Sequence, residues 1–358
     1  MLSLKKLSHG ASLLTAVLLL AACSNSSSTK DSVTTSDVSL RLSDAPVGDL
    51  EQVVFTVDKI IFRRDGADDV VVDTFTSDEL NDGDGIVDEE TFTLDLLTVQ
   101  GNENRLVLDS VTLPVGDYQN MILKVLDEDL NYSYVKEQDN DTLKELKVPS
   151  DGLKLGAFSV AAQSTQAFVV EFGLQQAMTY NPGKDRYILK PRGVRIVRLE
   201  EATSIEGVVD LAEINMTEAC VGSLSSNAYL YAGHDLDASL LGDVFVRVDD
   251  DPTDPEMPEQ DDNVPENIIA PLVATAITER EDETGTGDYI FSYLDAGDYT
   301  VAISCLAGDQ VDDPVQYDGI SIPLPATELI EVTLAAETQL HCDFPLGETP
   351  ACSSNTVE

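Results

Sequence analysis

Leu113-Pro114-Val115-Gly116-Asp117-Tyr118 leads directly into an apolar run that continues to Val125, and this stretch decides the fold class. Pro and Gly predict a turn in which Gly supplies a positive φ. Tyr118 then begins a strand, with its ring on the core and its hydroxyl able to bond the turn. The pattern L-x-x-G-D-Y recurs at Leu294-Asp295-Ala296-Gly297-Asp298-Tyr299. The recurrence has two open explanations, a turn used twice or shared ancestry of two β domains.

The segments around these turns are short, rich in β-branched and aromatic residues, and bounded by Asp, Gly, Asn or Pro. Such segments predict strands, and residues 174–178 predict one helical turn. The predicted strands are 38–42, 52–62, 70–72, 92–97, 106–113, 118–125, 157–161, 167–172, 187–197, 204–209, 228–231, 244–248, 268–277, 289–293, 299–304 and 329–334. Their close spacing predicts an all-β fold of two tandem β-sandwich domains, Ig-like or transthyretin-like.

Charge divides the chain into two parts. The 358 residues include 21 Lys+Arg and 66 Asp+Glu, a net charge of −45, which excludes an electrostatic nucleic-acid binder. Residues 1–198 hold 19 of the basic and 31 of the acidic residues, so residues 199–358 hold 2 and 35. The break predicts one domain over 38–200 and an acidic one over 204–346, followed by a tail at 347–358.

The first 22 residues predict an export signal. Lys5 and Lys6 precede the apolar segment 11–20, which is too short to span a bilayer. The sequence Leu20-Ala21-Ala22-Cys23 resembles the bacterial lipobox. That resemblance implies that Cys23 carries diacylglycerol and an amide-linked acyl chain such as palmitate, and Ser24, as in Gram-negative lipoproteins, implies the outer membrane. Residues 23–37 then form a Ser/Thr-rich tether. The alternative is an ordinary signal peptide with a chance cysteine.

Four further cysteines, Cys220, Cys305, Cys342 and Cys352, all lie in the acidic part. An even number of cysteines in an exported chain predicts disulfides, and four cysteines allow three pairings, which stay open. A zinc or redox role is the weaker alternative, because no C-x-x-C spacing occurs.

The most specific candidate for metal binding is Asp82-Gly83-Asp84-Gly85-Ile86-Val87-Asp88. Carboxylates at alternate positions around a Gly turn converge on one point, so Asp82, Asp84 and Asp88 are candidate calcium ligands. A solvated acidic hairpin is the alternative, since the loop lacks the EF-hand spacing. The acidic residues in 249–262 likewise have two interpretations. They either bind cations weakly or serve solubility and hydration.

A basic stretch opposes this acidity, with Lys184, Arg186, Lys190, Arg192, Arg195 and Arg198 within 15 positions. It predicts either a patch for an anionic partner, such as a polysaccharide or lipid A phosphate, or an ion-pair seam against the acidic second half. We favour the seam.

No sequence motif predicts catalysis. The chain contains no G-x-S-x-G, H-E-x-x-H, P-loop or G-x-G-x-x-G pattern. A carboxylate-pair hydrolase remains an alternative because acidic residues abound, but the absence of Trp removes the usual platform for stacking sugars. We therefore do not predict an enzyme.

Two family resemblances follow from these residues. Residues 38–197 resemble the bacterial lipoprotein family known as domain of unknown function 4382, through 42–46, 94–97, 113–118, 148–150 and 187–191. The second half resembles the transthyretin-like or carboxypeptidase-regulatory-like sandwich through 207–209, 287–291 and 294–301. Similar surface domains sometimes form a Lys–Asn isopeptide bond, which the absence of Lys after Lys190 excludes within the second domain.

The sequence thus predicts a non-enzymatic protein anchored by lipid at the outer membrane, with a binding or structural role and with protein or polysaccharide partners. Calcium is the one candidate cofactor. An accessory subunit of a transport or secretion assembly, facing the periplasm, is the main alternative.

Overall fold

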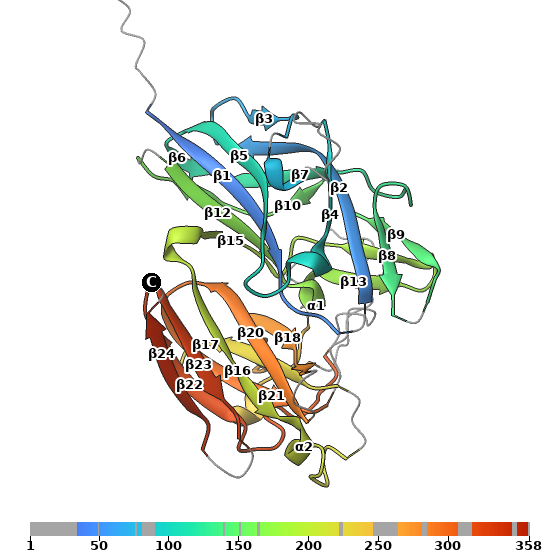
Figure 1. Ribbon diagram of the computed structural model, residues 1–358, viewed down its shortest axis with the longest axis vertical. Coiled ribbons are helices and arrows are strands. Elements are labelled where there is room, and N and C mark those ends of the chain that lie inside the picture. The colour runs from blue at the N-terminus through green and yellow to red at the C-terminus, as the bar shows by residue number, and fades with distance from the viewer. Residues whose placement is uncertain are drawn as a thin grey trace, which may run out of the picture. The chain divides into compact units, whose positions relative to one another are not determined.

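The computed structural model describes residues 34–48, 50–75, 77–80, 90–138, 140–149, 152–162, 165–221, 225–245, 264–280, 285–306, 317–345 and 349–356. Strands dominate these ranges, and the two α-helices have four residues each. The all-β prediction is confirmed. Each sheet takes its strands either from β1–β15 or from β16–β24, which we call the N-terminal and C-terminal sandwiches (Figure 1).

The N-terminal sandwich consists of β1 (Thr35–Asp44), β2 (Leu50–Arg63), β3 (Val70–Val72), η1 (Asp78–Leu80), β4 (Phe92–Asp95), η2 (Leu96–Val99), β5 (Arg105–Pro114), β6 (Gly116–Tyr118), β7 (Asn120–Val125), β8 (Tyr134–Glu137), β9 (Leu143–Lys147), β10 (Leu153–Lys154), β11 (Phe158–Val160), β12 (Thr165–Phe172), α1 (Leu174–Ala177), β13 (Met178–Asn181), β14 (Arg186–Leu189), β15 (Val194–Arg198) and η3 (Leu199–Glu201). The predicted helical turn is confirmed as α1. The predicted strand 187–197 is two strands, β14 and β15, because the chain turns at Gly193 with a φ of 71°.

The C-terminal sandwich consists of β16 (Thr203–Asp210), α2 (Leu211–Ile214), β17 (Asn227–Ala232), η4 (Ala238–Leu240), β18 (Val273–Ala276), β19 (Thr278–Glu279), β20 (Thr286–Leu294), β21 (Gly297–Ser304), β22 (Leu329–Leu334), β23 (Thr338–Asp343) and β24 (Ala351–Thr356). The predicted tail from residue 347 is corrected here, because residues 351–356 form β24 and pair with β23 over six positions. The part of the predicted strand 244–248 that is described contains no strand.

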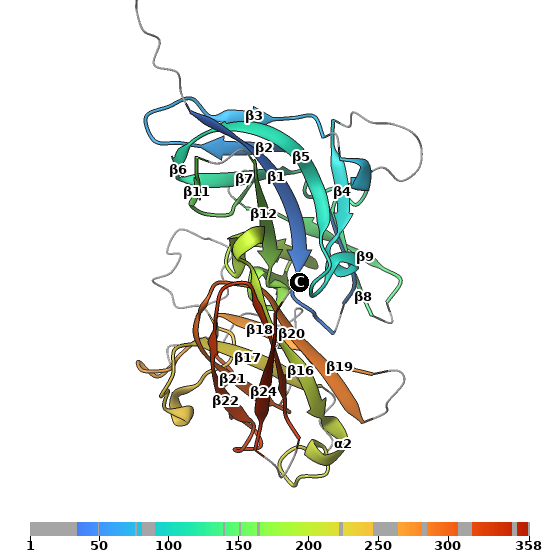
Figure 2. The same ribbon diagram turned by 60° about the vertical axis from the view of Figure 1, so that its left-hand side comes forward.

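The two sandwiches use the same order of strand pairing. One sheet runs β15-β12-β1-β5 and its counterpart runs β24-β23-β16-β20, with β19 added at the end. In each, the two middle strands are parallel and the outer pairs are antiparallel. The facing sheets correspond as well, since β10-β7-β2 matches β22-β21-β17. Figure 2 labels β7 and β2 of the one sheet and β22, β21 and β17 of the other. The N-terminal sandwich differs by the added strands β8, β9, β14 and β13, which prolong its sheet beyond β2.

The tyrosine of the recurring L-x-x-G-D-Y turn makes the same hydrogen bond in both sandwiches. The buried Tyr118 donates from its hydroxyl to the Pro114 carbonyl at 2.8 Å, and Tyr299 donates to the Asp295 carbonyl at 2.9 Å. The predicted core position of the rings and their bond to the turn are confirmed. A positive φ is confirmed at Gly116, at 132°, but Gly297 does not adopt one.

Apolar side chains of the facing sheets meet to form each core. In the N-terminal sandwich Leu40 and Phe168 of one sheet and Phe62 and Leu123 of the other belong to a single buried cluster. A second buried cluster lies in the C-terminal sandwich. It includes Cys220 and Cys305. Burial of this apolar surface is the main favourable contribution to folding.

Candidate functional site

The residues predicted to bind calcium, Asp82, Asp84 and Asp88, lie outside the described residues, and so does Cys23. Calcium binding and lipidation therefore stay predictions. Within the described ranges, no group of three or more His, Cys, Asp or Glu side chains is placed to hold a metal ion. The helices of those ranges include none that is long and apolar enough to cross a membrane.

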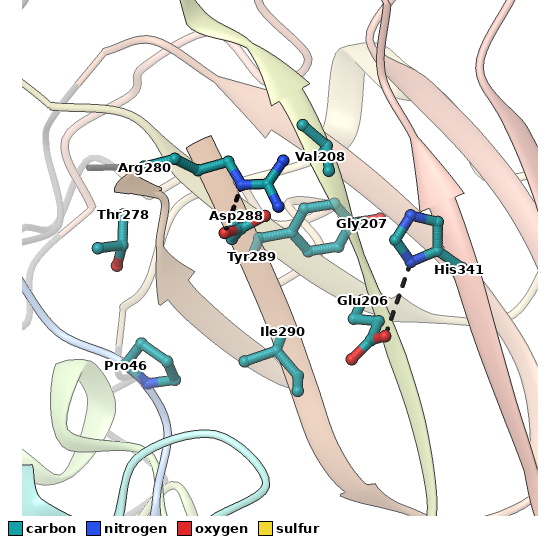
Figure 3. A pocket seen from close by; sticks show the side chains of 10 residues that line it. All are labelled: Pro46, Glu206, Gly207, Val208, Thr278, Arg280, Asp288, Tyr289, Ile290 and His341. Atoms are coloured by element: carbon teal, nitrogen blue, oxygen red, sulfur yellow. Dashed lines mark ion pairs between the residues drawn. The ribbon is translucent and has the colours of Figure 1, made fainter. Parts of the chain in front are cut away.

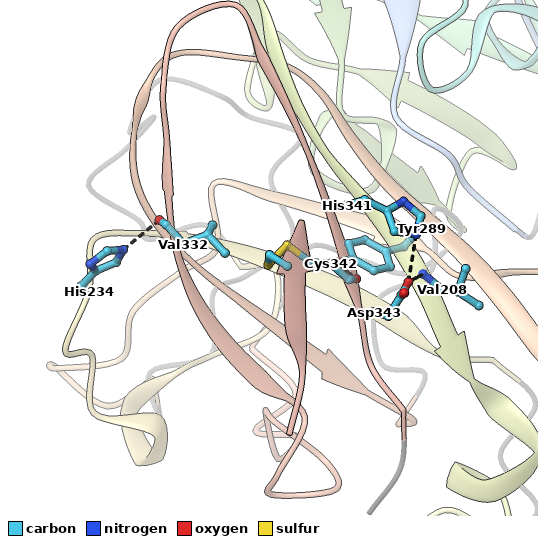
Figure 4. Close-up of a disulfide and its surroundings, with 8 residues drawn as sticks. Val208, His234, Tyr289, Val332, His341, Cys342 and Asp343 are labelled. Carbon is cyan, nitrogen blue, oxygen red and sulfur yellow. Dashed lines mark hydrogen bonds and ion pairs between the residues drawn. A yellow bond between two sulfur atoms is a disulfide. The ribbon is translucent and has the colours of Figure 1, made fainter. Parts of the chain in front are cut away.

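The four predicted disulfide cysteines form two bonds. Cys220 pairs with Cys305 across 85 positions, and Cys342 pairs with Cys352 across 10 positions on the neighbouring strands β23 and β24 (Figure 4). The pairing that the sequence left open is thereby assigned.

The basic stretch is held mainly by partners in its own sandwich. Arg186 forms an ion pair with Glu128, and Arg192 donates to the Gln176 carbonyl at 2.8 Å. Arg195 does reach the C-terminal sandwich, where it donates to the carbonyl of Ser292 at 2.9 Å. The ion-pair seam that we favoured from the sequence would join basic side chains to carboxylates of the second half. The contact made by Arg195 instead uses a backbone carbonyl.

Arg195 also forms an ion pair with Glu171, whose side chain is only 2% exposed. Burial raises the pKa of Glu171 to about 7, against the opposing effect of Arg195. The neighbouring Asp44 is fully buried, and burial together with Glu171 raises its pKa well above the usual range, although Gln100 donates to it at 3.3 Å. This acid pair is shielded from solvent, so it cannot meet a polymeric substrate and gives no support to a hydrolase.

Tyr293 of β20 joins the same contact. Its ring packs with Val169 and Val197, and its hydroxyl donates to the Asn102 carbonyl at 2.9 Å while accepting from the Asn104 amide at 2.8 Å. No sequence pattern signals these residues, because they come together from positions almost 200 apart. We interpret the contact as structural.

One concave surface lies on the outer face of the sheet formed by β19, β20, β16 and β23. Successive side chains of a strand point to opposite faces of the sheet, so every second side chain of these strands reaches this face. Glu206 of β16 stands directly opposite Ile290 of β20, and Val208 opposite Asp288. These residues line a cleft of about 360 Å³ (Figure 3).

Charged side chains of both signs line this cleft. Arg280 Nε lies 3.2 Å from Asp288 Oδ2, and His341 Nδ1 lies 3.6 Å from Glu206 Oε1 (Figure 3). His341 Nε2 is also 3.0 Å from an oxygen of Asp343. Because the charges of Arg280 and Asp288 oppose each other within the cleft, this pair favours a neutral ligand with many hydrogen-bonding groups over an ion.

Gly207 and Tyr289 form the floor of the cleft. A Cβ at Gly207 would lie 1.8 Å from the Cys342 carbonyl oxygen and 3.0 Å from the Tyr289 ring. The absence of a side chain thus lets the buried Tyr289 lie across β16 and donate to that carbonyl at 2.8 Å. Burial raises the pKa of Tyr289 well above its usual value, so the hydroxyl stays a donor.

A second hollow, of about 500 Å³, is lined by Tyr317 and residues 319–324. The buried Asp243 accepts from the Asp318 and Ile320 amides at 2.9 and 3.4 Å and so holds this segment in place. Burial raises the pKa of Asp243 to about 6. We assign Asp243 a structural role.

Comparison with known families gives one match. Residues 35–191 are similar to the family described as Domain of unknown function (DUF4382). This range contains most of the N-terminal sandwich, and the family description assigns no activity to it. Comparison with curated proteins gives no match.

Comparison with solved structures gives distant likenesses. A leucine-rich repeat protein from Bacteroides thetaiotaomicron is 11% identical with a TM-score of 0.20, and the alignment covers 87% of this chain but 26% of that one. The CBM26-family module CBMbc of Eubacterium rectale Amy13K, solved with maltoheptaose, is 12% identical over 90% of this chain and 97% of its own, with a TM-score of 0.19. The fimbrial anchor protein Mfa2 of Porphyromonas gingivalis is 8% identical over 90% and 98%, with a TM-score of 0.20. At TM-scores this low, these likenesses carry no argument about this chain.

Proposed function

We propose that the chain is a non-enzymatic protein of the cell envelope, anchored in the outer membrane through acylated Cys23, with a binding or structural role. The observation that carries the location is the pairing of all four cysteines that follow Cys23 into two disulfides. Disulfides form and persist in oxidising compartments outside the cytoplasm. Two or three acyl chains on Cys23 would make the attachment effectively permanent, since each buried CH₂ contributes about 0.8 kcal/mol.

Metabolic labelling with an alkyne fatty acid tests the anchor. The full chain, expressed in a bacterium that processes lipoproteins, should carry the label and sediment with membranes, and Cys23→Ala should lose both properties. A matched control, Cys352→Ala, removes a cysteine that the proposal does not lipidate and should keep the label. A full chain without label would refute the anchor.

The domain organisation that accompanies this proposal is a signal peptide at 1–22 and two sandwiches that meet near residue 200. The hydrogen bonds that Arg195 donates to the Tyr293 and Ser292 carbonyls are consistent with this organisation. Protease treatment of intact cells distinguishes a surface protein from the periplasm-facing accessory subunit, because only an outward-facing chain would be cleaved.

The cleft of Figure 3 is our candidate for ligand binding. Its internally opposed charges support an uncharged, hydroxyl-rich ligand, so we propose a polysaccharide segment over a charged peptide. Calorimetry with neutral oligosaccharides should give saturable binding that Asp288→Asn weakens, because the change removes the ion-pair partner of Arg280. Asp298→Asn, at an exposed position outside the cleft, is the control. Equal affinities for the two variants would exclude the cleft.

A further inference from the structure

The two disulfides differ in their surroundings. Cys220 and Cys305 are 1% and 0% exposed and belong to the core of the C-terminal sandwich. In the second bond Cys342 is fully buried, but Cys352 is exposed on the edge strand β24. An external thiol can therefore reach one sulfur of the second bond without any opening of the core, whereas the first bond is protected by burial.

Comparison of the two sandwiches shows what this exposed bond does. With the L-x-x-G-D-Y turns aligned, β15 is the counterpart of β24, and the facing pair Phe168 and Arg198 takes the place of Cys342 and Cys352. Side chains hold β15 against its sandwich, since Val197 is buried and Arg195 forms the ion pair with Glu171.

The edge strand β24 has much less side-chain support. Residues 351–354 are all exposed, so apolar packing adds little to the six backbone pairs with β23. The disulfide takes the place of the packing and the ion pair that hold β15. Its cleavage would remove the main side-chain attachment of residues 351–354, the part of this strand whose side chains are described.

We propose that the Cys342–Cys352 bond is a site of thiol–disulfide exchange that controls whether β24 stays paired, and that its reaction partner is a dithiol. A thiolate of the dithiol attacks the Sγ of the exposed Cys352, the bond to Cys342 breaks, and Cys342 leaves as a thiolate that takes up a proton. The second thiol of the dithiol then attacks the mixed disulfide and releases Cys352 as a thiol. Two electrons pass to the protein, and the dithiol ends as a disulfide.

Release of β24 then uncovers the edge of β23. That edge carries unpaired N–H and C=O groups that can accept a strand from another chain. The reaction would thus move the open edge of the sheet from β24 to β23.

Reduction of the folded chain by graded dithiothreitol, followed by alkylation and peptide mass spectrometry, tests the exchange. Cys342 and Cys352 should be alkylated at least about tenfold faster than Cys220 and Cys305, because the latter pair needs the core to open. Equal rates, or faster reaction of the Cys220–Cys305 bond, would overturn the proposal.

Hydrogen exchange tests the structural consequence. The amides of 351–356 should exchange about tenfold faster or more after this bond is reduced, while β16 and β20 keep their protection. The double variant Cys342→Ser with Cys352→Ser should match the reduced protein, and Cys220→Ser with Cys305→Ser should not show the selective change at β24. Unchanged exchange at β24 after reduction would refute its control by the disulfide.

Discussion

Replacement of Glu171 by Gln should make the chain more stable at alkaline pH and leave it nearly unchanged at pH 4.5. The folded protein raises the pKa of Glu171 from its ordinary 4.5 to about 7, because burial disfavours the carboxylate more than Arg195 favours it. At about 1.4 kcal/mol for each pKa unit, ionisation of Glu171 in the folded state costs about 3 kcal/mol. Gln has the shape of the protonated Glu171 and cannot ionise, so the variant avoids this cost.

The sign of the pH dependence follows from linkage. Below pH 4.5 Glu171 is protonated in both the folded and unfolded states, so its contribution to stability is fully present. Between pH 4.5 and about 7, Glu171 ionises in the unfolded chain but stays largely protonated in the folded one. The contribution of Glu171 to stability is therefore progressively lost as the pH rises. Asp44 titrates in both proteins, but the negative charge of Glu171 contributes to its raised pKa, and Glu171→Gln removes that contribution. The difference between the two proteins therefore measures Glu171 together with its coupling to Asp44.

Urea unfolding at pH 4.5, 6, 7 and 8 measures this difference. The stability of Glu171→Gln minus that of the parent chain should rise by about 3 kcal/mol between pH 4.5 and 8. Glu201→Gln is the control, because the 59%-exposed Glu201 pairs with Arg198 at the surface and should change stability by about 0.5 kcal/mol or less at every pH. A difference that does not change with pH, or a variant that is less stable at pH 8, would refute this account of the buried acid.

Three further predictions concern other parts of the chain. Tyr118→Phe and Tyr299→Phe should each lower the free energy of unfolding by about 1 kcal/mol through loss of the bond to the turn, and the losses should add because the sites lie in different sandwiches; strong coupling in the double variant would contradict this. Gly207→Ala should cost about 3 kcal/mol or more in urea unfolding, because the new Cβ would meet the Cys342 carbonyl, and a neutral effect would show that the approach is looser than described. Asp84→Ala should abolish saturable calcium binding by the chain from Ser24 onward in calorimetry, and equal binding by variant and parent would exclude the predicted loop.

The elements that sequence could predict are those whose signal is local. The strand after Tyr118 is predicted because turn residues precede an apolar run. The helical turn α1 is predicted because its signal lies within a few consecutive residues. The strands that sequence missed carry polar residues. β9 reads Leu-Lys-Glu-Leu-Lys and β24 reads Ala-Cys-Ser-Ser-Asn-Thr, and neither contains the alternation of a half-buried strand. Both form because a neighbouring strand supplies hydrogen-bond partners.

The candidate site shows the same limit. The concentration of basic residues between Lys184 and Arg198 is visible in the sequence, but their partners are not. Arg186 meets Glu128 and Arg195 meets Glu171 because strands distant in the chain become neighbours in a sheet. The cleft on β16, β20 and β23 had no sequence signal, because alternation along three separate strands brings its charged residues to one face.

The sequence by itself determined the all-β class, the recurring turn with its buried tyrosine and the contrast in charge between the two halves, because each depends on residues adjacent in the chain or on composition alone. Tertiary structure decided the pairing of the four cysteines, the shared order of strands in the two sandwiches and the burial of Asp44 and Glu171. These features depend on contacts between residues from 10 to almost 200 positions apart. Such contacts arise only when the sheets pair and pack, so no local pattern encodes them.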